Sequence, residues 1–170
     1  MASAHDGEYA AFARGRSSVY LLAIGFSVCT IRKVEVAMDK GISELRSSPM
    51  MAHLLDAIEE RKDIGHYGRL VFVIVSRYFL DESTVVRLIS TQPDMGETRA
   101  RALVLQAASR NYNPPSRERI VEWQRLQEFP ICPNPDDPNG CNVYRELTFP
   151  DEVYDNIQDL WEKKAESTDE

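Results

Sequence analysis

Several residue types and motifs are scarce in this chain of 170 residues. Three cysteines are too few for the disulfide framework of a small secreted domain. No phosphate-binding P-loop, no GxGxxG turn and no nucleophile motif occurs, so the chain alone gives little sign of catalysis. Its apolar runs, such as residues 70–75, are far too short to span a bilayer, and the N-terminus lacks a secretory signal pattern. We therefore expect a cytoplasmic protein that does not interact with membranes.

Charge is unevenly distributed along the chain. The net charge of −7 argues against non-specific binding to long stretches of nucleic acid. Residues 96–125, however, hold six arginines and three acidic residues, whereas residues 151–170 hold eight acidic residues and two lysines. The simplest interpretation is two solvated helix faces. A sharper hypothesis is a small anion-binding site in an otherwise acidic protein.

The pattern of apolar residues predicts a mainly α-helical protein. Ser48 and Pro49 form a helix start, and Asp81 is placed to cap the next short helix. Further helices are expected over residues 97–110 and 116–126 and from about residue 150. Residues 66–80 are ambiguous, because their β-branched content favours a strand and their length favours a buried helix. Residues 129–141 contain four prolines and a glycine and predict a long loop.

The apolar residues of these helices give a predicted core. In the helix over 97–110 we expect Ala102, Leu103, Leu105 and Ala107 to face inward. In the helix over 116–126 we expect the same of Ile120, Val121, Trp123 and Leu126.

His66 and Arg69 stand just ahead of the most apolar run in the chain. If a helix begins near Gly65, these two residues lie on one face of its first turn. Free backbone N–H groups and the positive end of the helix dipole are found at the same place. Arginine adds a bidentate fork and histidine a further donor. This turn is therefore a candidate site for a phosphate or triphosphate, against the alternative of an ordinary solvated helix start.

The cysteines allow more than one interpretation. Cys132 and Cys141 lie in the proline-rich loop and offer half of a metal site, which makes a metal-dependent sensor one hypothesis. They are equally compatible with two free thiols. Cys29 stands in an apolar stretch, where a buried and inert thiol is expected.

Four features of residues 49–148 occur in the order found in one known family. They are the 49–57 helix pattern followed by Gly65-His66-Tyr67-Gly68-Arg69, the segment 81–94 ending in QPDM, the motif Tyr112-Asn113-Pro114-Pro115-Ser116, and then Cys132 and Cys141. In this respect the chain resembles the C-terminal domain of the large subunit of archaeal–eukaryotic-type DNA primase. The resemblance implies a single helical domain over residues 47–165 with a long proline-rich loop. Residues 1–46 would then be a partly flexible N-terminal segment and residues 166–170 an acidic tail.

The family holds a four-iron, four-sulfur cluster on four cysteines, and this chain departs from that pattern. Met50 stands at the first cysteine position and Arg117 at the second. Methionine is a poor ligand for such a cluster, and a cationic guanidinium is not a ligand at all. We therefore expect that the cluster is absent and that Cys132 and Cys141 are remnants of it.

The resemblance also implies a function. The family's domain does not polymerise nucleotides but helps a catalytic small subunit to start a primer. Carried over by position, His66 and Arg69 would bind the initiating nucleotide or the 5′-triphosphate of the primer. Arg101, Gln106 and Arg110 would contact the template. The implied partners are the catalytic primase subunit, a primer–template and an NTP. The alternative is an α-helical adaptor that binds another protein and no nucleic acid.

Overall fold

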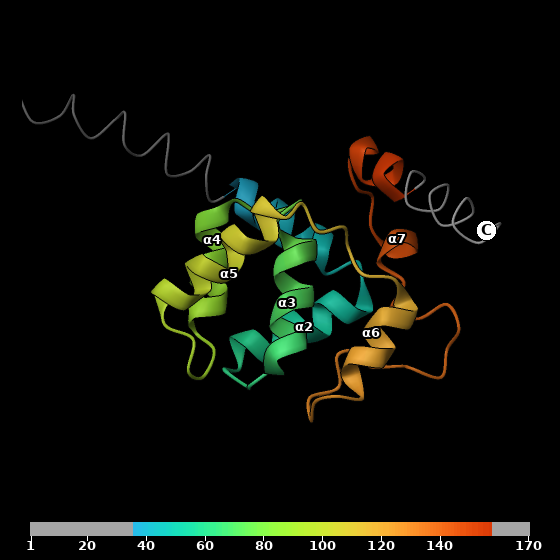
Figure 1. Cartoon of the computed structure of the whole chain (residues 1–170), viewed down its shortest axis with the longest axis horizontal. Coiled ribbons are helices and arrows are strands. Elements are labelled where there is room, and N and C mark those ends of the chain that lie inside the picture. Colours follow the sequence, from blue (N-terminus) through green and yellow to red (C-terminus); the bar gives the residue numbers. More distant parts are fainter. Residues whose placement is uncertain (1–35, 158–170) are drawn as a thin grey trace, which may run out of the picture. The chain divides into compact units, whose positions relative to one another are not determined.

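The structure is a computed structural model, and it describes residues 36–157. Over that range the chain is mainly helical and has no strand, as the sequence predicts (Figure 1). None of the helices between residues 36 and 157 is both long enough and apolar enough to cross a membrane. The predictions for residues 1–35, Cys29 and the acidic tail lie outside the described residues. The helices are α2 (Pro49–Glu59), α3 (Gly65–Ser76), α4 (Glu82–Ser90), α5 (Glu97–Ser109), α6 (Arg117–Gln124) and α7 (Val143–Glu146), with further helical segments over 36–45 and 151–157.

Side-chain caps set three of the helix starts. Ser48 accepts the N–H of Met51 at the start of α2, and Asp81 accepts the N–H of Thr84 at 3.0 Å at the start of α4. Ser116 caps α6 in the same way. The Ser48 hydroxyl also donates to Glu146 of α7 at 2.5 Å, which ties the start of α2 to a helix 98 residues further along the chain.

Helix α3 is the central element, and it resolves the ambiguous segment in favour of a helix. Its residues 71–76 are all buried, and it packs against α2, α4, α5 and α6 (Figure 1). A helix surrounded in this way can be apolar on all sides. The surrounding contacts therefore outweigh the strand propensity of its valines and isoleucine.

Helices α3 and α5 run in the same direction. Helix α4, which lies between them in the sequence, runs in the opposite direction. At one end Arg69 of α3 donates to the carbonyl of Pro93, just before α5. At the other end Arg77, which follows α3, donates to the carbonyl of Ala107 at 2.5 Å and to the Asn111 side chain at 2.9 Å. The two ends of α3 are thus fixed to the two ends of α5.

The predicted inward faces of α5 and α6 need correction. In α5 Leu105 is 49% exposed and Ala102 is also exposed, whereas Ala100 and Val104 are buried together with Ala107. These buried residues are small and recur at helical spacing, which allows α5 to pack closely on its neighbours. In α6 Leu126 is 64% exposed, because the helix ends at Gln124 and Leu126 lies beyond it.

The core extends to the N-terminal side of residue 47. Leu45 is fully buried, and Gly41 lies so close to Phe79 that a Cβ at Gly41 would come within 2.3 Å of the Phe79 carbonyl oxygen. The helical segment 36–45 is therefore part of the packed structure and is not a linker to it.

Candidate functional site

The first turn of α3 has an unusual backbone and no side-chain cap of its own. Gly65 has a φ of 71°, which a residue with a Cβ rarely adopts. The N-cap residue Ile64 has an apolar side chain that accepts no hydrogen bond from the helix. The N–H groups of this turn must therefore find their partners elsewhere in the protein.

An anionic oxygen is bound at this turn. One carboxylate oxygen of Asp63, Oδ1, accepts the N–H of Gly65 at 2.9 Å and Nη2 of Arg69 at 2.7 Å. The Arg69 guanidinium is held in place because Nη2 also donates to the carbonyl of Pro93 at 3.0 Å. The Arg69 side chain is only 14% exposed, while that of Asp63 is 57% exposed. The helix start and Arg69 together therefore form a site for one anionic oxygen, which Asp63 fills.

Gln127 covers the adjacent part of the turn. Its Oε1 accepts the N–H of Tyr67 at 2.9 Å and that of Gly68 at 3.3 Å. Its Nε2 donates to the carbonyls of Ile64 and Phe129. The turn that the sequence predicts to be a phosphate site exists, but its donors already have acceptors within the protein.

The two residues predicted for the triphosphate differ in exposure. His66 is exposed, and its ring meets that of Tyr67 edge-on with 5.3 Å between the ring centroids. Arg69 is largely covered, and its Nε is buried without a hydrogen-bond partner. A second buried donor without a partner, Nε2 of Gln92, belongs to an amide whose oxygen accepts the Ile64 N–H at 3.0 Å. Two buried side-chain donors next to the α3 start thus have no hydrogen-bond partner, although the backbone N–H groups of Gly65, Tyr67 and Gly68 have theirs.

The residues predicted for the template do not form one cluster. Arg101, Gln106 and Arg110 are all exposed on α5 or directly after it. Arg101 and Arg110 are nine residues apart, which at 3.6 residues per turn places them on opposite sides of the helix. Arg101 pairs with Glu97 at 3.0 Å and lies 3.9 Å from Glu82, whereas Arg110 donates to the Tyr112 hydroxyl.

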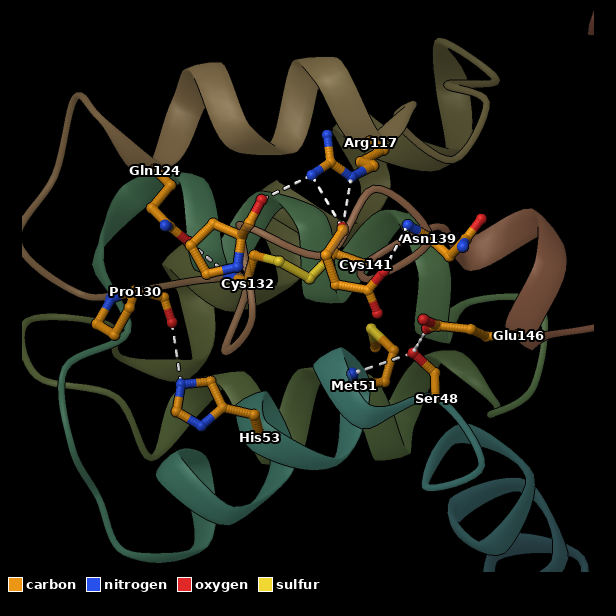
Figure 2. The surroundings of a disulfide bond; sticks show 12 residues. Ser48, Met51, His53, Arg117, Gln124, Pro130, Cys132, Asn139, Cys141 and Glu146 are labelled. Atoms are coloured by element: carbon orange, nitrogen blue, oxygen red, sulfur yellow. Dashed lines mark hydrogen bonds between the residues drawn. A yellow bond between two sulfur atoms is a disulfide. The ribbon is translucent and has the colours of Figure 1, made fainter.

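Cys132 and Cys141 form a disulfide bond, with 5.7 Å between their Cα atoms (Figure 2). The sequence left open half of a metal site or two free thiols, and the disulfide is neither of these. Arg117 reaches over the enclosed loop and donates to the carbonyls of Pro135 at 2.7 Å and Asp137 at 3.0 Å. The loop is thus fixed at its ends by the disulfide and near its tip by Arg117. The feature of the sequence that indicates this pairing is the presence of two cysteines within one short, proline-rich loop.

The side chains at the four positions that the resemblance assigns to cluster ligands do not fit an iron–sulfur cluster. Met50 is fully buried in the core, Arg117 is a cationic donor, and Cys132 and Cys141 share a disulfide. A cluster needs four thiolates, and this arrangement supplies none. Among residues 36–157, no group of three or more His, Cys, Asp or Glu side chains is placed to hold a metal ion.

Two further features were missed from the sequence. His53 of α2 binds the segment before the disulfide, since its Nε2 lies 2.9 Å from the carbonyl oxygen of Pro130 and its ring stacks on that of Phe129.

A shallow hollow of about 340 Å³ lies at the other end of α3 from His66 and Arg69. It is lined by Arg77, Tyr78, Leu80, Glu82, Val104 and Ala108.

Comparisons with protein-family models, with curated proteins and with solved structures find no match for this chain.

Proposed function

We propose that this protein is a non-catalytic accessory part of a DNA primase that binds the initiating nucleotide or the primer 5′-triphosphate at the start of α3. One observation carries the proposal: a single anionic oxygen, Asp63 Oδ1, accepts hydrogen bonds from both the Gly65 N–H and Arg69. A helix start combined with a guanidinium is well suited to phosphate oxygens. The ordered resemblance of residues 49–148 to the primase large-subunit domain names the triphosphate as that anion.

In this proposal a phosphate oxygen takes the place of the Asp63 carboxylate. Asp63 is more than half exposed and can turn into solvent, whereas the Pro93 carbonyl keeps Arg69 directed at the site. The exposed imidazole of His66, on the same turn, supplies a further donor. Gln106 and Arg110 lie four residues apart on one side of α5 and would contact the template strand together. Arg101, on the opposite side, would contact a separate part of the nucleic acid. A separate catalytic subunit would perform the synthesis.

The decisive experiment compares two versions of one primer–template at moderate salt, one with a 5′-triphosphate and one with a 5′-hydroxyl. We expect a clear preference for the triphosphate. Arg69→Ala should weaken that binding about tenfold or more, because a charge-assisted hydrogen bond is lost. Asp63→Asn should strengthen it, since the competing carboxylate is removed.

Two matched variants control for charge. Arg119→Ala removes an exposed arginine that pairs with Glu122 on α6, and it should leave the preference unchanged. Glu60→Gln removes one negative charge three residues before Asp63, from a side chain that pairs with Lys62 and not with Arg69, and it should not reproduce the effect of Asp63→Asn. If Arg69→Ala binds the triphosphate as tightly as the unaltered protein, the site assignment is wrong. If neither primer–template binds, the adaptor hypothesis becomes the better account.

A further inference from the structure

The loop closed by the disulfide ends at a residue, Cys141, whose backbone conformation is unfavourable in a free chain. Cys132 and Cys141 are 1% and 3% exposed, so the disulfide is built into the core. Cys141 has a φ of 62°, in the left-handed region, which is unfavourable for a residue with a Cβ. Once the covalent bond to Cys132 is broken, the backbone at Cys141 is therefore expected to relax towards a more common conformation.

The segment that leads into the disulfide is also the segment that covers the start of α3. Residues 127–132, called the cover segment below, begin with Gln127, whose amide accepts the Tyr67 N–H. They end at Cys132, whose N–H donates to Gln124 of α6 at 2.6 Å (Figure 2). Between these points the Pro130 carbonyl is bound by His53 of α2. Cys132, which the disulfide joins to Cys141, is thus the far end of a short, tightly connected stretch whose other end contacts α3.

We propose that the Cys132–Cys141 disulfide is a redox-controlled lock on the cover segment. In the oxidised protein Gln127 stays on the N–H groups of Tyr67 and Gly68, and only the Gly65 N–H and Arg69 are open to an incoming phosphate. In the reduced protein the cover segment loosens, and the N–H groups of Tyr67 and Gly68 become accessible as well. The consequence for triphosphate binding rests on the proposed function, whereas the opening of the cover segment does not.

The chemistry requires a dithiol reductant. One thiolate of the dithiol attacks a sulfur of the disulfide, which forms a mixed disulfide and releases the other cysteine as a thiolate. The second thiol of the reductant then displaces the remaining cysteine. Two electrons and two protons pass to Cys132 and Cys141, and the dithiol ends as its own disulfide.

The test uses the full chain carrying Cys29→Ser, so that Cys132 and Cys141 are its only cysteines. Amide hydrogen exchange of Tyr67 is measured by NMR before and after treatment with dithiothreitol. Reduction should speed exchange at Tyr67 about tenfold or more, as expected for a local opening, and leave Val73 in the middle of α3 unchanged. A variant that also carries Cys132→Ser and Cys141→Ser should exchange rapidly at Tyr67 with or without dithiothreitol.

Three results would overturn the lock. The first is two alkylatable thiols that remain after the purified protein is treated with a disulfide oxidant. The second is a disulfide that dithiothreitol does not reduce unless the protein is unfolded. The third is complete reduction with unchanged exchange at Tyr67. If Tyr67 responds to reduction but no triphosphate binds in either redox state, the lock stands and the proposed function fails.

Discussion

Gly65 and Gln127 lie in direct contact, so closely that a Cβ on Gly65 would come within 2.6 Å of Oε1 of Gln127. The start of α3 is therefore shaped by a residue 62 positions further along the chain. Glycine suits this position for two reasons: the backbone there is left-handed, and a Cβ would come too close to the Gln127 side chain.

Replacing Gly65 by alanine tests this contact. Gly65→Ala should destabilise the protein by about 1–2 kcal/mol from the left-handed backbone alone, and it should also displace Gln127 from Tyr67. Urea unfolding followed by circular dichroism would measure the loss. Gly96→Ala is the matched control, because a Cβ at Gly96 meets nothing within 4 Å and the backbone there is extended. Equal losses in the two variants would contradict the contact.

The role of Arg117 in holding the loop can be measured in the same way. Arg117→Ala removes the hydrogen bonds to the carbonyls of Pro135 and Asp137 and should cost about 2 kcal/mol, because charged donors are lost from a partly buried site. Arg119→Ala, two residues away, breaks only an exposed pair with Glu122 and should cost less than about 0.5 kcal/mol. If the unfolding midpoints of the two variants coincide, Arg117 does not support the loop.

Asp81 makes the stability of the protein depend on pH. Hydrogen bonds from the hydroxyl of Ser83, and then from Thr84, lower the pKa of Asp81 from its usual 3.8 to about 2. Because the folded-state pKa is the lower one, the stabilisation is complete above about pH 4 and is lost as the pH falls towards 2. Asp81→Asn keeps a good helix cap but cannot titrate.

The unaltered protein should therefore lose its stability advantage over Asp81→Asn between about pH 4 and pH 2. Chemical denaturation at a series of pH values measures this difference. Asp81→Ala should be less stable than Asp81→Asn by about 1 kcal/mol at every pH, because the cap itself is lost. A pH-independent gap between the unaltered protein and Asp81→Asn would contradict the assignment.

The disulfide should contribute to stability apart from any regulatory role. Closing a loop of this length is expected to contribute about 2–3 kcal/mol by restricting the unfolded chain. The double variant Cys132→Ser and Cys141→Ser should lose that amount in denaturant unfolding. The unaltered protein in dithiothreitol should approach the same value. A double variant as stable as the oxidised protein would show that the disulfide adds nothing.

The helices could largely be predicted because their signals are local. Ser48, Asp81 and Ser116 cap the helices that follow them, and each cap is read from neighbouring residues. Whether residues 66–80 form a strand or a helix cannot be read from neighbouring residues, because it depends on the helices that surround α3. Leu105 of α5 is exposed although its side chain predicts burial, because hydrophobicity alone does not show which face of a helix meets its neighbours.

The candidate site was only partly predictable for the same reason. The positions of His66 and Arg69 on one helix turn follow from their spacing. The carboxylate of Asp63 and the amide of Gln127, which occupy the donors of that turn, carry no comparable motif. Gln127 in particular reaches α3 from a segment that follows α6, and only the folded chain brings the two together. The disulfide joins two cysteines of one short loop, whereas the resemblance to a cluster-binding domain favours remnants of a metal site at these positions.

The hydrogen bond between Ser48 and Glu146 has a consequence for biosynthesis. The two residues are 98 positions apart, and Ser48 is also the cap of α2. At translation rates of about 5–20 residues per second, Glu146 is made roughly 5–20 seconds after Ser48. Throughout that interval the Ser48 hydroxyl, at the start of α2, lacks its Glu146 acceptor. The buried residues that flank Glu146, Val143 and Leu147, can join the core only after this interval, so the folding of the described region is completed late in synthesis.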